Sequence, residues 1–401
     1  MLLYFLLLFI GNNAINKEID EVERKRLEHM NETTHILKNL LQNYNRWLRP
    51  NFNKKPVIVS MSVLVDSIGP IKETENSFRL DFNIRQRWHD ERLKFNYSSD
   101  KGITLSHDFL KKIWIPDSYF PDSLSEMKHD VMVPNILLRL QPSGDVLLSA
   151  RTTVISKCVI DLMYFPFDIQ TCKLLIETYG YTTEDMIFKW STDNSSVVVN
   201  QNITLAQFDL FGHNSLEYNL SFSTGNFSDL EIQFFLKRIF VSHFVQSYCP
   251  CILIVIISWT AFWIDPRNTP ARAFLSITGV LTLMTLMRGV NSKLPNVSKV
   301  KAIDYFFIIS ILFVFAGLME FFINSYIVRL RKFSTPYTPY SEKGIVYWTI
   351  NKFTLIPEYI KDIDPVKIDT YSRRVFPFSY IIAILTYFGV YVNILQEQMN
   401  K

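Results

Sequence analysis

Apolar and polar residues are distributed unevenly along the chain, and the change falls near position 243. Beyond it, four apolar segments are each long enough to cross a bilayer, which takes about 20 residues. They comprise residues 244–264, 270–289, 303–328 and 375–395, and the first and the fourth carry no charge. The pattern therefore predicts four membrane-spanning helices in the second half of the chain.

The first half of the chain alternates apolar and polar residues in short runs that end in turn residues. Examples are residues 57–65, 78–84 and 136–140, and Pro142-Ser143-Gly144-Asp145 turns the last run into residues 146–148. Many short strands at such intervals are typical of a β-sandwich. Before them, residues 19–44 carry apolar side chains at helical spacing, which predicts an N-terminal helix.

Basic residues set the orientation of the predicted spans. They flank residues 329–374, the short connection between the third and fourth spans: Arg329, Arg331, Lys332, Arg373 and Arg374. Because short basic loops stay on the cytoplasmic side, this connection is predicted to be cytoplasmic. Four spans then put residues 15–242 and the tail 396–401 outside the cell.

Residues 1–14 form an apolar run that ends in small and polar residues, which indicates a secretory signal peptide. The next segment contains six Asn-X-Ser/Thr sequons, and their density supports an exported glycoprotein. They lie at Asn31, Asn96, Asn194, Asn202, Asn219 and Asn226. Asn296 also matches, but it lies in a short loop between spans, and we interpret it as a chance match.

The positions of the cysteines and the net charge indicate which classes of function the sequence supports. Cys158 and Cys172 are a lone pair in the exported half, which predicts a disulfide. Cys249 and Cys251 lie inside an apolar span, where we interpret them as free thiols rather than metal ligands. The net charge of +4 is small and scattered, so nucleic acid is not implied. No catalytic triad, metal spacing or phosphate loop indicates an enzyme, and we expect no cofactor.

Residues 158–172 read Cys-Val-Ile-Asp-Leu-Met-Tyr-Phe-Pro-Phe-Asp-Ile-Gln-Thr-Cys. This loop resembles the signature of the Cys-loop receptors, the pentameric ligand-gated ion channels. Further motifs match that family in order: Trp88, Trp114-Ile115-Pro116-Asp117, Tyr179-Gly180-Tyr181-Thr182, Lys237-Arg238, Ser258-Trp259 and Val300-Lys301-Ala302-Ile303-Asp304. The resemblance implies an extracellular, immunoglobulin-like sandwich of about ten strands, a four-helix transmembrane bundle, and a ring of five subunits in a postsynaptic plasma membrane.

In that family the second span lines the pore, and one helical face of it carries five residues. They are Phe274, Thr278, Leu281, Thr285 and Arg288. A ring of Leu281 side chains would form a hydrophobic constriction that closes by dewetting. Phe274 departs from the family, which generally has a small residue there. The subunit would then conduct poorly alone, or would mix with partner subunits that carry small residues.

Pro270-Ala271-Arg272 resembles the motif of the anion-conducting branch, which includes GABA and glycine receptors. Cation-conducting members usually carry Glu at the position of Ala271. A ring of Arg272 at the inner mouth would attract anions, and Arg288 and Lys293 would add positive potential near the outer end. We therefore predict chloride selectivity.

The resemblance also implies an agonist site between neighbouring subunits. Its principal face would comprise Tyr119, Glu177, Thr178, Tyr179, Phe222, Thr224 and Phe227, and its complementary face Asn83, Arg85, Arg139 and Ser149. Aromatic rings attract an ammonium group and Glu177 would pair with it, while Thr224 and Arg85 would hold a carboxylate. A zwitterionic amino acid fits both the ammonium and the carboxylate positions, and GABA is the first candidate. Asn83 stands where relatives often have Phe. A glycan on Asn226 would hinder access to the site.

Coupling between site and pore is predicted at Phe165, Pro166, Phe167, Asp168 and Arg238, with Arg238 pairing Asp168 and Glu73. The expected partners are a small-molecule neurotransmitter, chloride ions, the lipid bilayer and four further subunits, with no nucleic acid and no metal.

Two alternatives stay open. One is an auxiliary or non-conducting subunit of a mixed receptor, and the other is a cation-selective or other-amine-gated member of the same family.

Overall fold

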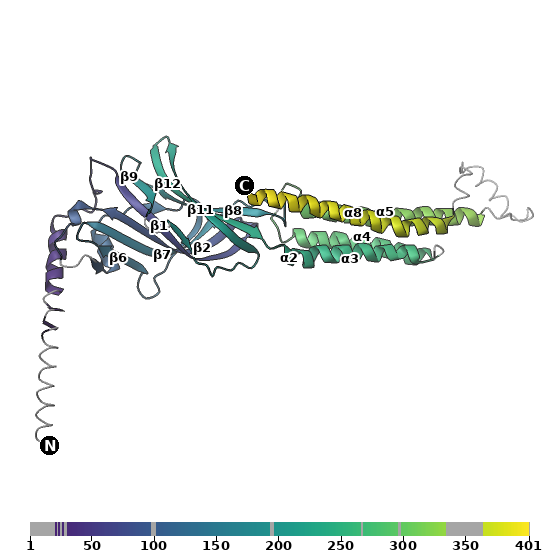
Figure 1. The fold of residues 1–401 in the computed structure, drawn as a ribbon, viewed down its shortest axis with the longest axis horizontal. Helices are drawn as coiled ribbons and strands as arrows, with labels where there is room; N and C mark the ends of the chain where they lie inside the picture. Colours follow the sequence, from purple (N-terminus) through teal and green to yellow (C-terminus); the bar gives the residue numbers. More distant parts are fainter. Residues whose placement is uncertain are drawn as a thin grey trace, which may run out of the picture.

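The structure is a computed structural model that describes residues 21–400 apart from 22, 25, 28–29, 98–101, 193–195, 266–267, 296–297 and 334–363. The predicted signal peptide, the sequon at Asn194 and most of the predicted cytoplasmic connection lie outside the described residues. Figure 1 shows a β-rich unit at one end of the molecule and a set of long helices at the other. A helix through residues 30–42 precedes the β-rich unit.

Two sheets form the β-rich unit, which confirms the predicted sandwich. The larger sheet has the order β10-β1-β2-β7-β6-β3, with β5 on β7 and β9 on β1, and the smaller has the order β11-β12-β8-β4. The strands of the larger sheet are β1 (Val57–Lys72), β2 (Ser77–His89), β3 (Ile103–Leu105), β5 (Ser123–Lys128), β6 (Ile136–Leu140), β7 (Asp145–Lys157), β9 (Met186–Trp190) and β10 (Val197–Val199). Those of the smaller sheet are β4 (Ser118–Tyr119), β8 (Ile169–Thr178), β11 (Phe208–Phe222) and β12 (Gly225–Arg238).

Alternation along each strand explains how the two sheets pack. In β1, Val59, Met61, Val63 and Val65 are buried in the core, while the residues between them are more exposed. Because side chains on a strand point alternately to opposite faces, one face of each sheet enters the core. The predicted disulfide between Cys158 and Cys172 is present and lies in this core.

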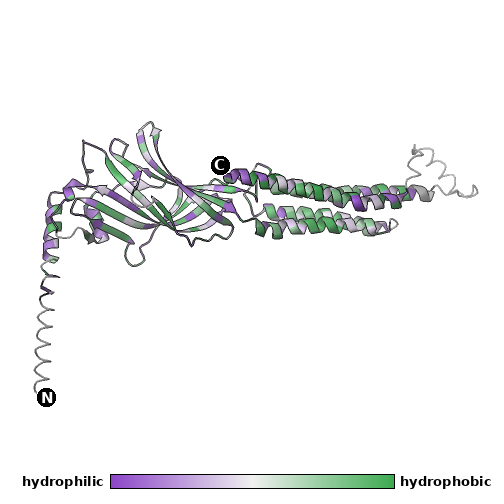
Figure 2. Cartoon of the chain, in the orientation of Figure 1, coloured by the Kyte–Doolittle hydropathy of each residue, from purple (hydrophilic) through white to green (hydrophobic). Residues whose placement is uncertain are grey.

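Among the described residues, four helices or runs of consecutive helical segments are long and apolar enough to cross a membrane, as predicted. The first joins α2 (Phe240–His243), a π-helical turn (Phe244–Tyr248), α3 (Cys249–Trp259) and a 3-10 turn (Thr260–Trp263). The others are α4 (Thr269–Asn291), α5 (Ala302–Phe333) and α8 (Pro365–Asn400). Figure 2 shows that apolar residues cover most of these helices, as a lipid-facing surface requires.

Helix α8 extends beyond both ends of the predicted span at residues 375–395. Pro365 stands at its start, where the fixed backbone angle of proline suits a helix and its missing N–H costs nothing. The added first turns are polar, and one of their side chains, Asp369, is buried inside the bundle. A hydropathy pattern detects only the apolar stretch, so it missed this part of the helix.

Candidate functional site

A carboxylate with an aromatic wall lies at the edge of the smaller sheet. Tyr119 on β4 stands opposite Glu177 on β8, and its hydroxyl donates a hydrogen bond to Glu177 Oε2 at 2.8 Å. The ring of Tyr179 stands edge-on to that of Tyr119 at 5.3 Å, and the Tyr179 side chain is 74% exposed. Burial and the Glu177 carboxylate raise the pKa of Tyr119 to about 12, so this tyrosine stays a neutral donor.

The β11–β12 hairpin provides the second group of predicted principal-face residues. The rings of Phe222 and Phe227 meet edge to face at 5.8 Å, and Thr224 is exposed in the turn between them. Gly225 has a φ of 135°, and a Cβ atom there would come within 2.8 Å of Thr182, so the turn requires glycine. The Thr183 N–H donates to the Asn226 carbonyl at 2.8 Å and ties the hairpin to the loop after β8.

Thr178 does not take the predicted role. Its side chain is fully buried, and its hydroxyl donates to the Tyr181 carbonyl at 2.8 Å. The structure places Thr178 on the opposite side of the strand from Glu177, because successive strand residues face opposite sides. Thr178 instead fixes the loop that carries Tyr179 and Tyr181.

The predicted complementary-face residues share the exposed face of the larger sheet. Arg85 on β2 stands opposite Ser149 on β7, and Arg139 on β6 stands opposite Leu147 on the same strand. Asn83 is tied by a 2.7 Å bond from its side-chain amide to Asp66, whereas the Arg85 side chain is exposed. The two predicted faces thus lie on different sheets of the sandwich.

The five described sequons are all exposed, as glycan attachment requires. Their asparagines are Asn31, Asn96, Asn202, Asn219 and Asn226. Asn226 lies in the hairpin of the predicted agonist site, and its side-chain oxygen accepts a hydrogen bond from Ser221 at 2.7 Å.

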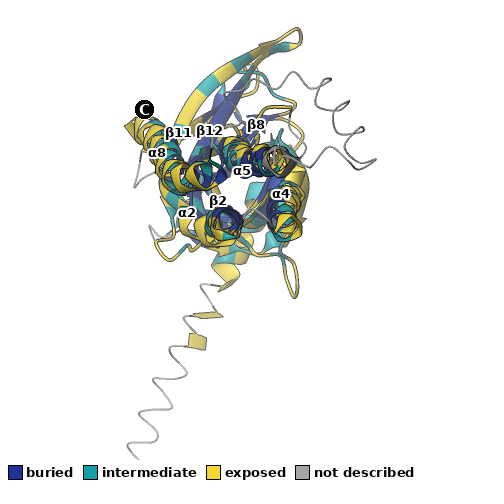
Figure 3. Ribbon diagram, turned by 90° about the vertical axis from the view of Figure 1, so that its right-hand side faces the viewer, coloured by how far each residue is buried: buried dark blue, intermediate teal, exposed yellow. Residues whose placement is uncertain are grey.

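The subunit's own bundle leaves the predicted pore stripe of α4 uncovered. Arg272, Ser276, Gly279 and Leu283 form the buried side of this helix. The stripe is mostly exposed: Phe274 is 69% and Leu281 61% exposed, Thr285 and Arg288 are exposed, Thr278 is half-buried, and Pro270 and Ala271 lie in the first turn. Figure 3 shows the outer faces of the bundle as exposed surface.

Arg272 differs from its predicted place at the pore mouth. Its side chain is 1% exposed, and its guanidinium donates to both carboxylate oxygens of Asp369 on α8, at 3.0 and 2.6 Å. Its Nε donates to the Ile264 carbonyl at 2.9 Å. Arg272 is thus paired inside the bundle rather than open, because a buried charge requires a partner and Asp369 neutralises it.

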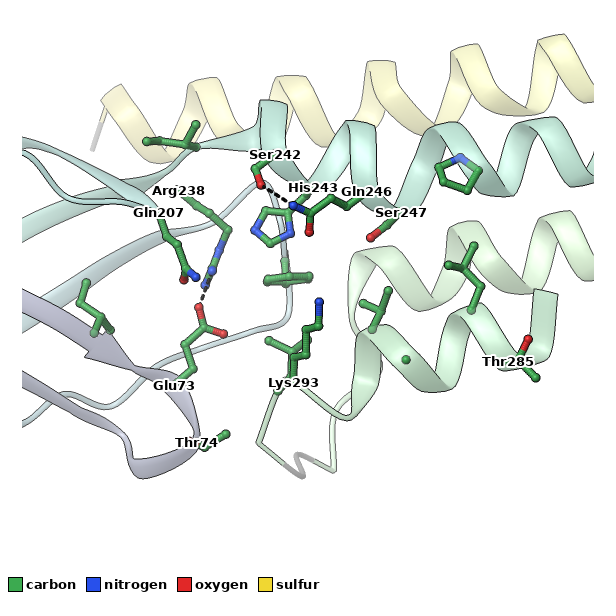
Figure 4. Close-up of a pocket in the computed structure, with 18 of the residues that line it drawn as sticks. Glu73, Thr74, Gln207, Arg238, Ser242, His243, Gln246, Ser247, Thr285 and Lys293 are labelled. Carbon is green, nitrogen blue, oxygen red and sulfur yellow. Dashed lines mark hydrogen bonds and ion pairs between the residues drawn. The ribbon is translucent and has the colours of Figure 1, made fainter. Parts of the chain in front are cut away.

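Arg238 ends β12 and ties together segments of the sandwich at the point where the chain enters the helices. Its Nε and Nη2 donate to the Asp168 carboxylate at 2.7 and 3.0 Å, and its Nη1 donates to Glu73. All three side chains are buried, and the guanidinium lies 4.6 Å from the ring centre of Phe165. Both predicted partners of Arg238 are thus in contact with it, and Figure 4 shows the Arg238–Glu73 pair beside α2.

The loop between the two cysteines reaches into the helical bundle. The Ile303 N–H at the start of α5 donates to the Phe165 carbonyl at 3.1 Å. The ring of Phe167 stacks on Phe240 of α2 at 4.8 Å and on Tyr391 of α8 at 5.8 Å. Pro166, whose peptide bond with Phe165 is cis, lies between these two anchors. This loop therefore contacts three of the four spans.

Two features escaped the sequence analysis. One is a cavity of about 820 Å³ between the first span and α4, lined among others by Arg238, Gln246 and Lys293 (Figure 4). The other is a pair of buried acidic side chains, Asp369 in the helical bundle and Asp229 in the smaller sheet. Local patterns gave little signal for them, since an acid in a strand or helix is usually solvated.

Comparison with known proteins agrees with this geometry. Residues 33–240 match the neurotransmitter-gated ion-channel ligand binding domain, and residues 247–367 match the neurotransmitter-gated ion-channel transmembrane region. The chain is similar to the gamma-aminobutyric acid receptor subunit rho-3 of Rattus norvegicus, with 35% identity over 86% of this chain and 85% of the relative. The rho-3 subunit of Homo sapiens is 39% identical over 71% of this chain and 61% of the relative.

Proposed function

The chain belongs to the neurotransmitter-gated ion-channel family, and we propose that it is a subunit of a chloride channel opened by GABA or a related amino acid. In this proposal five subunits surround a pore in a postsynaptic plasma membrane. The agonist binds between the sandwiches of neighbouring subunits, outside the cell, and the pore runs between their α4 helices.

The proposed agonist is supported by the arrangement of Glu177, Tyr119 and Tyr179. A buried carboxylate beside exposed aromatic edges suits an ammonium group. Arg85 is exposed on the other sheet and suits a carboxylate. Because the two groups belong to different sheets, a neighbouring copy is needed to bring a cationic and an anionic pole together, which fits a zwitterionic agonist bridging two subunits.

Anion selectivity rests on the charge pattern of α4 without Arg272. The helix contains no Asp or Glu, and Arg288 is exposed in its last turn. Its first residues, Thr269 and Pro270, begin the helix at the inner end of the span. A helix N-terminus carries about half a positive charge, so five such ends around one pore favour anions even though Arg272 is paired.

Phe274 favours a second candidate, an auxiliary subunit that conducts only in mixed assemblies. Its ring is exposed on the pore stripe one turn from the start of α4. Five copies would narrow the inner end of the pore, whereas one or two copies among smaller residues would leave it open. Current that requires a co-expressed partner subunit would support this candidate over a pore made of this chain alone.

The agonist site is tested by substituting Glu177 and recording currents with GABA under voltage clamp. We expect Glu177→Gln to raise the EC50 by about tenfold or more, since a hydrogen bond to a charged group contributes about 1.5–3 kcal/mol. Glu184→Gln is the matched control, because Glu184 is exposed in the following loop. An EC50 for Glu177→Gln equal to that of the control would contradict the proposed site.

A further inference from the structure

Four side chains form a single row across the smaller sheet. Tyr119 on β4 pairs in register with Glu177 on β8, Glu177 pairs with Asp229 on β12, and Asp229 pairs with Tyr218 on β11. Directly opposed residues on one face of a sheet have Cβ atoms about 5 Å apart. The row therefore places two carboxyl groups side by side, with a tyrosine at each end.

Asp229 is the most deeply buried member of this row, with 0% of its surface exposed. Tyr119 donates to Glu177 at 2.8 Å, and Tyr218 donates to Glu231 at 2.9 Å. Within the described part of the chain no close hydrogen bond reaches either carboxylate oxygen of Asp229, and the Tyr218 hydroxyl and the Leu230 N–H approach it only loosely. An ionised carboxylate in that position would be desolvated and poorly paired, which is costly.

The charges around Asp229 do not neutralise it. Glu177 faces it from β8 and Glu231 follows it on β12, while Tyr218 and Tyr119 contribute neutral hydroxyls. The nearby cation, Lys173 on β8, lies 2.9 Å from Glu231 and is engaged there. Burial has the largest effect on the pKa of Asp229 and outweighs the opposing effect of the Tyr218 hydroxyl. Together with the negative charges of Glu177 and Glu231, it raises this pKa to about 7.

We propose that the buried Asp229 holds a proton beside Glu177 while the agonist site is empty, and that Asp229 is a positioning residue that sets the negative charge offered to the agonist's ammonium group. This inference rests on the proposed function of Glu177. An arriving ammonium favours the ionised form of Asp229, so binding releases this proton from the Asp229 carboxyl to the solvent.

The proposal predicts that agonist potency depends on external pH. Neither the amine nor the carboxylate of an amino acid such as GABA titrates between pH 6 and 8. A change of the EC50 in this range therefore arises from a titrating group of the protein. For the intact chain, we expect the EC50 for GABA to fall about three- to tenfold from pH 6 to pH 8, since a tenfold change corresponds to one unit of pKa shift on binding.

Asp229→Asn and Asp229→Ser remove the titrating carboxyl group and should make the EC50 independent of pH. The controls are Asp209→Asn and His213→Gln, which change titratable groups elsewhere on the same hairpin and should keep the slope of the intact chain. A purely structural role of Asp229 would shift the EC50 equally at every pH. A flat profile for the intact chain, or an unchanged slope in either Asp229 variant, would overturn the proposal.

A second measurement needs no agonist and separates this proposal from the proposed function. The folded chain holds a proton on Asp229 that the unfolded chain has lost above about pH 4, so folding stability should fall between pH 5 and pH 8. We expect the Tm of the purified intact chain to fall by about 2 °C or more relative to Asp229→Asn over that range. Parallel Tm curves would overturn the proposed proton on Asp229. Divergent curves with no GABA current, either alone or with a partner subunit, would leave that proton standing and refute the agonist assignment.

Discussion

Arg238 is a charged residue that the fold buries almost completely. It is stable there because Asp168 and Glu73 accept its hydrogen bonds and because Phe165 and Phe208 face its guanidinium at 4.6 and 4.5 Å. Exposed ion pairs contribute about 0–1 kcal/mol, but breaking a buried pair costs about 3–5 kcal/mol because a charge is left without a partner. At the scale of single residues, this arginine holds together the end of the sandwich from which the chain enters the helices.

We predict that Arg238→Ala sharply reduces the amount of channel at the cell surface, and that Arg238→Lys keeps expression but raises the EC50. Lysine retains the charge but cannot donate to two carboxylates in the forked geometry of a guanidinium. Surface labelling and concentration–response curves measure the two effects. Lys237→Ala, at the preceding and less buried position, is the control. Normal surface levels and responses for Arg238→Ala would refute this role.

At the scale of elements, α8 fastens the first turns of α4, the proposed pore helix. Asp369 holds Arg272 of α4, and the side-chain amide of Asn324 on α5 donates to the same carboxylate at 2.7 Å. These three side chains come from three helices and are all buried. The position and tilt of α4 at its inner end therefore depend on a helix that does not line the proposed pore.

We predict that Asp369→Asn and Arg272→Gln each lower surface expression about tenfold or more, and that the double variant recovers most of it. Each single change leaves one buried charge without its partner, whereas the double change removes both charges. Quantitative surface labelling measures the outcome, with Lys367→Gln as an exposed control on the same helix. Additive losses in the double variant would show that the pair is not coupled.

The sequence predicted those elements whose pattern is local. Alternation indicated β6 over residues 136–140, and uninterrupted apolar runs indicated four spans. It did not predict partnerships set by pairing between distant strands or helices. Asp229 meets Glu177 only through the register of β12 on β8, and Asp369 meets Arg272 only through helix packing. Register and packing depend on the whole fold, so no local pattern contains them.

At the scale of the whole molecule, one strand connects the proposed agonist site to the membrane. Strand β12 runs for 14 residues, from Gly225 in the hairpin turn to Arg238 at the junction, and α2 begins at Phe240. At about 3.3 Å per residue it spans about 45 Å. Figure 1 shows the β11–β12 hairpin projecting from one side of the β-rich unit, with its strands leading toward the helices. Movement of the hairpin therefore reaches the first span through a continuous, hydrogen-bonded element.

The central claim is that this chain forms an agonist-gated pore for anions. The most direct test expresses the chain under voltage clamp, opens it with GABA and measures the reversal potential while external chloride is lowered tenfold at constant sodium. For an anion pore the reversal potential should shift by about 59 mV toward positive values, the size for one elementary charge and a tenfold concentration ratio. A reversal potential that ignores chloride and follows sodium instead would contradict the account.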